Sequence, residues 1–193
     1  MSKRDLMRER LAHHAARLMA EDGITDYAFA KRKAARQLGA SDTQHLPSNQ
    51  EVEEALRSFR ALYQRDSHPK VLRQLREDAQ ALMQRLAPLH PYLTGSVLSG
   101  TAGAQSDINL CVYSDDDKAV MLYLLRYNIP FDGGEWRTQI AGRMQMVPSF
   151  TVETEHGVPA HIVVLPASAA FSGSRKTDTH ADLAALESLL ATA

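Results

Sequence analysis

Apolar residues recur every three to four positions in four segments of the first half of the chain, which predicts four amphipathic helices. The segments are residues 5–21, 26–38, 48–64 and 69–86. Ser48, followed three positions later by Glu51, forms a capping-box pattern that marks the start of the third helix. The fourth helix carries the clearest apolar stripe, between Val71 and Leu86, and we interpret that stripe as core. The first part of the chain is therefore expected to be helical.

The pattern changes after residues 87–91, a segment that contains Pro88 and Pro91. About five to six short strands and two helices are expected beyond it. The expected strands are 92–93, 107–113, 129–131, 136–140, 144–153 and 160–165, the helices are 115–127 and 182–190, and the hairpin turns are 132–135 and 154–157. The sequence thus predicts an α+β protein with a helical N-terminal region, 1–88, followed by a domain, 89–193, in which helices flank a small mixed β-sheet.

Composition narrows the class of protein. The chain has 193 residues and a net charge of −1, so it has no overall field that would attract a nucleic acid or a membrane surface. Its one cysteine, Cys111, excludes a disulfide framework or a thiolate metal cluster within the chain, which is typical of a reducing compartment. The N-terminal residues lead into an amphipathic segment, and no apolar run approaches the roughly 18 residues of a membrane span. We expect a cytoplasmic protein that does not bind a membrane.

Small and polar residues gather between positions 95 and 109. Gly95 and Ser96 break a short apolar strand, and a loop of small residues leads to Asp107 and Asn109. Because alternate residues of a strand face opposite sides, Asp107 and Asn109 share one face of the strand that follows the loop. A Gly–Ser turn with free backbone N–H groups, beside two oxygen-bearing side chains, is typical of a site for a phosphate and a cation.

This stretch resembles the G-S-x-x-x-G…S-D-x-D signature of the minimal nucleotidyltransferases, in the DNA polymerase β superfamily. Gly95, Ser96, Gly100, Ser106 and Asp107 match the signature. The resemblance covers about residues 92–165 and implies a nucleotidyltransferase-like fold. It also implies that the first four of these residues bind the nucleotide, with the Gly95–Ser96 turn holding the β- and γ-phosphates of a nucleoside triphosphate.

The chain departs from the family at two of the three carboxylates that hold two Mg²⁺ ions. Asn109 replaces the second aspartate, and His161, at the start of the strand 160–165, stands where the third is expected. The resemblance implies Asp107, Asn109 and His161 as the catalytic positions, and Asp107 and Asn109 as ligands of Mg²⁺ or another divalent ion. Glu153, on the preceding strand, is an alternative to His161. Replacing a carboxylate by a neutral ligand removes about 4 kcal/mol of attraction for a cation at 4 Å, before desolvation, so this active site is degenerate.

Two functions follow from the resemblance. The first is a transferase that binds a nucleoside triphosphate with a divalent ion and moves a nucleoside monophosphate to a hydroxyl acceptor, whose identity the sequence does not specify. The second is a catalytically inactive nucleotidyltransferase-fold protein that acts as a ligand sensor or a partner-binding module. The sequence leaves open whether the chain is an enzyme.

Charged clusters elsewhere have simpler interpretations. Lys31, Arg32, Lys33 and Arg36 lie on the second expected helix, where they could contact the phosphates of a nucleic acid. The balanced net charge instead favours a solvated helix face. The run 115–117, three aspartates, precedes a helix, and we interpret it as an acidic helix start rather than a metal site.

Overall fold

The computed structural model describes residues 3–40, 46–63, 68–171 and 179–192. The chain divides into two compact units, one formed by residues 1–72 with 103–106, and the other by residues 73–102 with 107–193. No helix in the described part of the chain is both long enough and apolar enough to cross a membrane.

The first unit is helical, as its periodicity predicts. It contains α1 (Lys3–Glu21), α2 (Tyr27–Gln37) and α3 (Asn49–Tyr63), and α1 packs against both other helices. Its core is rich in alanine, which lets the helices approach closely. Buried members of that core are Leu11, Ala15, Ala16, Ala30, Ala34, Val52 and Leu56.

The predicted capping box is present at the start of α3. The Ser48 N–H donates to Glu51 Oε2 at 2.6 Å, and the Glu51 N–H donates to Ser48 Oγ at 3.2 Å. Glu51 also accepts from Arg8 Nη2 of α1 at 2.8 Å, so one carboxylate caps α3 and ties it to α1. These contacts hold the pKa of Glu51 at about 2, well below its ordinary value, with the Arg8 hydrogen bond as the main cause.

The second unit is built on a five-stranded mixed sheet in the order β1-β2-β5-β4-β3. Strands β2 and β5 are parallel, and the other neighbours are antiparallel. Its elements in chain order are α4 (His68–Arg85, with 68–72 grouped in the first unit), η2 (Ala87–Leu89), β1 (Tyr92–Thr94), α5 (Gly95–Ser99), β2 (Ile108–Tyr113), α6 (Asp117–Arg126), β3 (Asp132–Ile140), β4 (Arg143–Glu153), β5 (Pro159–Leu165), η3 (Ala167–Phe171) and α8 (Leu183–Thr192). The sequence-based division at 88/89 places all of α4 with the N-terminal region, whereas most of α4 groups with the sheet.

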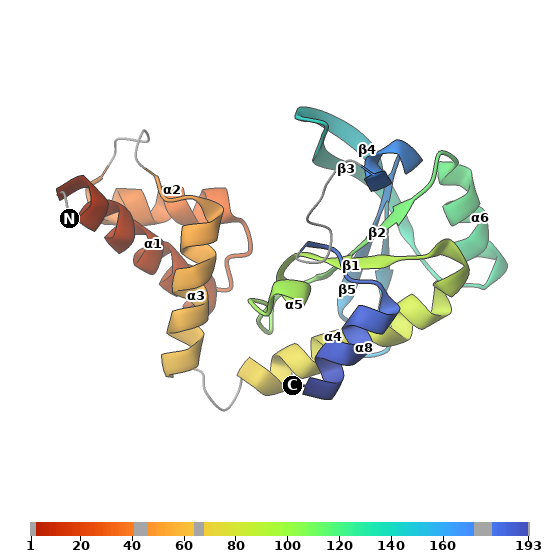
Figure 1. The fold of residues 1–193 in the computed structure, drawn as a ribbon, viewed down its shortest axis with the longest axis horizontal. Coiled ribbons are helices and arrows are strands. Elements are labelled where there is room, and N and C mark those ends of the chain that lie inside the picture. Colours follow the sequence, from red (N-terminus) through yellow and green to blue (C-terminus); the bar gives the residue numbers. More distant parts are fainter. Residues whose placement is uncertain (1–2, 41–45, 64–67, 172–178, 193) are drawn as a thin grey trace. The chain divides into compact units, whose positions relative to one another are not determined.

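One face of the sheet is apolar and supplies the core of the second unit. Residues paired across neighbouring strands point to the same face, and on this face the residues of β1, β2 and β5, together with two residues of β4, are buried. They are Leu93, Ile108, Leu110, Val112, Phe150, Val152, Ala160, Ile162 and Val164. The buried side chains of α4 (Leu75, Ala79, Leu82 and Met83) and Leu186 of α8 supply the matching helical layer. Figure 1 shows α4 and α8 side by side, and Gln80 of α4 bonds Glu187 of α8 at 3.4 Å.

Two local expectations are wrong. Residues 132–135, expected to form a hairpin turn, belong to β3, where Gly133 and Gly134 pair with Phe150 and Ser149 of β4. The turn lies instead at Ala141 and Gly142, which have φ values of +48° and +80° and join the paired residues at the ends of the two strands. Segment 129–131 is not a strand. A Gly–Gly pair resembles a turn locally, but here cross-strand hydrogen bonds with β4 hold it extended.

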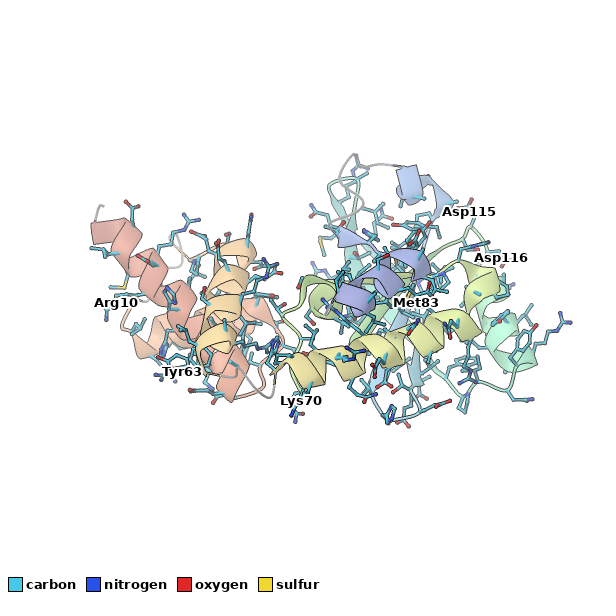
Figure 2. All side chains as sticks on the ribbon, turned by 60° about the horizontal axis from the view of Figure 1, so that its bottom comes forward. Arg10, Tyr63, Lys70, Met83, Asp115 and Asp116 are labelled. Atoms are coloured by element: carbon cyan, nitrogen blue, oxygen red, sulfur yellow. The ribbon has the colours of Figure 1, made fainter. Side chains whose placement is uncertain are left out.

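The other expected hairpin turn and the acidic helix start are confirmed. At 154–157 the Thr154 N–H donates to the Val158 carbonyl at 3.0 Å, and Gly157 takes a φ of +74°. At the start of α6 the Asp116 carboxylate accepts from the Lys118 N–H at 3.0 Å. Asp115 accepts from the Ala167 N–H at 2.9 Å (the two aspartates are labelled in Figure 2). Both carboxylates therefore have structural partners.

Candidate functional site

The second face of the sheet carries a row of polar residues, one from each strand. Strand register aligns Thr94 of β1, Asn109 of β2, His161 of β5, Thr151 of β4 and Asp132 of β3. Residues directly opposite one another across a sheet have Cβ atoms about 5 Å apart, so these side chains line a continuous polar band. The band lies opposite the apolar face, and the predicted positions Asn109 and His161 stand next to each other at its centre.

His161 links this band to Asp107 through its two ring nitrogens. Its Nε2 lies 3.2 Å from Asp107 Oδ2, and its Nδ1 lies 3.0 Å from Thr151 Oγ1. A carboxylate can only accept, so Nε2–H is the donor to Asp107, and in the neutral ring Nδ1 accepts from the Thr151 hydroxyl. The His161 side chain is about one-fifth exposed and that of Asp107 nearly one-half. The structure therefore brings together the retained aspartate and the histidine that the sequence placed at the third position.

Gly95 sits directly against Asn109. Its φ of +73° lies in the left-handed region, and a Cβ added there would come within 3.2 Å of Asn109 Nδ2. Thr94 Oγ1 donates to the Asn109 carbonyl at 3.3 Å, which joins the turn to β2. Asn109 Oδ1 is buried and has no hydrogen-bond partner among the described residues. Glycine is thus strongly favoured where the Gly–Ser turn approaches the polar band.

The remaining residues of the signature have different surroundings. Ser96 is the second residue of the short helix α5, and its carbonyl accepts three backbone N–H groups, from Gly100, Thr101 and Ala102, at 3.0, 2.9 and 3.0 Å. Those N–H groups are therefore committed to the turn and not presented to a ligand. Gly100 closes α5 with a φ of +84°. Ser106 groups with the first unit, where its Oγ accepts from the Gly103 N–H at 2.9 Å.

The donor set does not fit a centre for two divalent ions. Asp107, Asn109 and His161 offer one carboxylate, one amide and one imidazole that is already bonded to that carboxylate. Among the residues that the structure describes, no group of three or more His, Cys, Asp or Glu side chains is placed to hold a metal ion. Glu153, the alternative third ligand, lies at the end of β4 opposite Pro159 and lines a separate cavity beside α4. Two Mg²⁺ ions require several converging oxygen ligands, and this site supplies too few.

Two residues near the site were missed in the sequence. Trp136 of β3 packs against His161, with ring centroids 5.2 Å apart, and keeps more than one-third of its surface exposed. Arg76 of α4 is buried and donates to the carbonyls of Val97 and Leu98 at 3.1 and 3.2 Å, which closes the C-terminal end of α5. Burial lowers the pKa of Arg76. In the sequence, the only indication of a structural role for Arg76 is its charge beside the apolar stripe of α4. No pattern in the sequence links Trp136 to the site.

Two of the basic residues of α2, Lys31 and Lys33, have partners within the first unit. Lys33 Nζ lies 2.7 Å from Asp22 Oδ2, and Lys31 Nζ lies 2.8 Å from Asn49 Oδ1. These contacts support the interpretation of the cluster as a helix face that stabilises its own unit.

Comparison of the chain with known proteins finds a weak similarity to one chain of a solved structure. No family model matches the chain, and no curated protein matches it. One chain of a solved structure described as a GLD-2/RNP-8 complex is similar at 18% identity with a TM-score of 0.32. The match covers 54% of this chain and 46% of that one, so this chain aligns with less than half of the other chain's length. At this level of similarity, the case for a function rests on the residues of the site.

Proposed function

We propose that this chain is a nucleotidyltransferase-like protein that binds a nucleoside triphosphate on the polar face of its sheet without transferring a nucleotide. The observation that carries the proposal is the Gly95–Ser96 turn packed against Asn109, beside the hydrogen-bonded pair Asp107 and His161. The resemblance of the turn to the family's phosphate-binding signature supplies the ligand class.

The phosphate end of the ligand is assigned to the turn. Thr94, the N-cap residue of α5, makes no capping hydrogen bond with its side chain. The first backbone N–H groups of a helix have no hydrogen-bond acceptor within the helix. The N–H groups of the Gly95–Ser96 turn, at the start of α5, are therefore suited to donate to phosphate oxygens. Neighbouring strands lie about 4.8 Å apart, so β1 and β5 are separated by roughly 10 Å. A ligand held at the turn can therefore extend along the polar band toward His161.

Transfer is the alternative, and the site argues against it. Nucleotide transfer in the family needs two ions that orient the triphosphate and activate the attacking hydroxyl. Asn109 and His161 remove two of the three charges that would hold those ions, and the hydrogen bond to His161 engages the remaining carboxylate. The chain is then a sensor or a partner-binding module that responds to the nucleotide.

Isothermal titration of the full chain with ATP, with and without Mg²⁺, tests the binding. We expect one site per chain, and an affinity that Mg²⁺ or Mn²⁺ changes by less than about tenfold because a single carboxylate faces the ligand. Gly95→Ala should weaken binding, whereas Gly157→Ala, which has a similar φ in a remote turn, should not. Absence of binding at about 10 mM ATP would remove the proposal.

Pyrophosphate release from the four nucleoside triphosphates, measured with Mn²⁺ present, tests the absence of transfer. We expect no release above that of Asp107→Ala. Release that Asp107→Ala abolishes would support the transferase instead, and the titration would still report binding.

A further inference from the structure

A cavity in the sheet-containing unit lies between α4 and the turn that joins β4 to β5. It has a volume of about 170 Å³ and is lined from α4 by Gln74, Glu77, Asp78 and Arg85 and from the turn by Glu155 and His156. Ligand pockets for drug-sized molecules measure about 300–1,000 Å³, so this one admits only a small group. It is separate from the polar band and does not depend on the proposed nucleotide site.

Asp78 is the distinctive residue of this cavity. Its side chain is 5% exposed, and it lies on the same helix as the buried apolar stripe. Its Oδ1 accepts from His156 Nδ1 at 2.5 Å and from Gln74 Nε2 at 3.4 Å. Its Oδ2 is buried and has no hydrogen-bond partner among the described residues. A buried carboxylate with one unsatisfied oxygen is costly to keep, and a positively charged donor would offset that cost.

The other charges on the cavity are mostly acidic. Glu77, Glu153 and Glu155 line it together with Asp78, against the guanidinium of Arg85 and the imidazole of His156. Glu77 is partly neutralised by Arg73, at 2.9 Å, and its side chain is 44% exposed. Leu82 and Ala81 add an apolar wall. The lining therefore combines excess negative charge with a surface against which methylene groups can pack.

We propose that this cavity binds a guanidinium group, carried either by a small free cation or by an arginine side chain of a partner protein. A guanidinium is planar, weakly hydrated and has five N–H donors, so its N–H groups can bond the Asp78 carboxylate and the surrounding glutamates. A compact ammonium is more strongly hydrated and gains less from a partly apolar slot. The methylene stem of the ligand would lie along Leu82.

Titration calorimetry of the full chain with three small probes tests this proposal. Agmatine represents a free cation, N-acetyl-arginine amide represents an arginine side chain in a peptide, and N-acetyl-citrulline amide is its uncharged counterpart. We expect at least one guanidinium probe to bind and the citrulline probe not to bind. Binding of agmatine alone identifies a free cation as the ligand class, and binding of the arginine amide identifies a protein side chain. No binding of either at about 10 mM, or equal binding of the citrulline probe, would overturn the proposal.

Variants locate the site. Asp78→Asn keeps the shape of the side chain and should weaken binding about 30-fold or more, the usual result of removing one partner of a buried charge pair. Glu135→Gln, an exposed carboxylate of β3 outside the cavity, is the matched control and should change binding less than about twofold. Glu155→Gln, an exposed cavity residue, should weaken binding about two- to fivefold and serves if Asp78→Asn does not fold. Unchanged affinity in the folded cavity variants would contradict the assignment.

Discussion

At the scale of single residues, Gly95 meets two constraints at once. Its backbone occupies the left-handed region at φ +73°, and its missing side chain leaves room for the Asn109 amide. Most residues that bear a Cβ are strained in that backbone conformation. A Cβ at position 95 would in addition crowd the Asn109 side chain. The Gly–Ser turn is therefore held in place by the strand that carries the candidate site.

Comparing Gly95→Ala with Gly157→Ala separates these constraints. Gly157 has a φ of +74°, and no atom lies within 4 Å of the position that a Cβ would take there, so its alanine variant should lose about 1 kcal/mol of unfolding free energy through backbone strain alone. Gly95→Ala should lose roughly 1 kcal/mol more, because Asn109 must move. Urea unfolding of both variants measures the difference. Equal losses of unfolding free energy in the two variants would show that the Asn109 side chain moves aside without destabilising the protein.

At the scale of elements, α5 depends on α4 for its C-terminal end. A helix of this length cannot satisfy its own last carbonyls, and the buried Arg76 guanidinium accounts for two of them, those of Val97 and Leu98. The Gly–Ser turn is the other end of the same short helix. A charge on α4 therefore contributes to positioning the proposed phosphate contact.

Replacing Arg76 should disturb both stability and the candidate site. Arg76→Gln is expected to cost about 2–3 kcal/mol, because two carbonyls lose a charged donor in a buried position. It should also weaken ATP binding. Arg73→Gln, on an exposed turn of α4 with an ion pair to Glu77, should cost less than about 1 kcal/mol. Denaturant unfolding and ATP titration of both variants provide the readout, and similar losses would argue against a specific role for Arg76.

The Glu51 contacts predict a pH dependence for the first unit. The folded pKa of Glu51 is about 2 against an ordinary 4.5, so its contribution to stability is present above about pH 4.5 and disappears as the pH falls through 2. Glu51→Gln should therefore be less stable than the parent at neutral pH, and the difference should shrink between pH 4.5 and 2. Circular dichroism melts across this range measure it. A difference that does not vary with pH would contradict the assignment. The side chain is 41% exposed, so added salt should reduce the effect.

At the scale of the whole molecule, each unit has its own buried core. The first is formed by α1, α2 and α3, and the second by the apolar face of the sheet with α4 and α8. Compact units with separate cores often unfold as separate cooperative steps.

Hydrogen exchange at increasing denaturant should resolve two groups of amides, one for each unit. Glu51→Gln should lower the protection of residues in α1–α3 and leave the sheet unchanged, whereas Arg76→Gln should do the reverse. Uniform loss of protection in both variants would show that the units unfold as one.

Local signals in the sequence are sufficient to predict several elements of this protein. Helical periodicity located α1 to α4, the Ser48–Glu51 pair marked the start of α3, and the α+β class followed from the change of period near residue 90. These features depend on residues within a few positions of one another, so the sequence of a single segment is enough to predict them. The same local view misassigned Gly133 and Gly134, because only pairing with β4 distinguishes an extended Gly–Gly from a turn.

Contacts between residues far apart in the chain are visible only in the folded structure. Parallel pairing of β2 with β5 sets Asn109 beside His161, and the path of β3 carries Trp136 onto the same imidazole. The burial of Asp78 beside His156 likewise joins residues 78 positions apart. Contacts of this range depend on strand order and register, which the sequence specifies only through the combined free energy of the folded core.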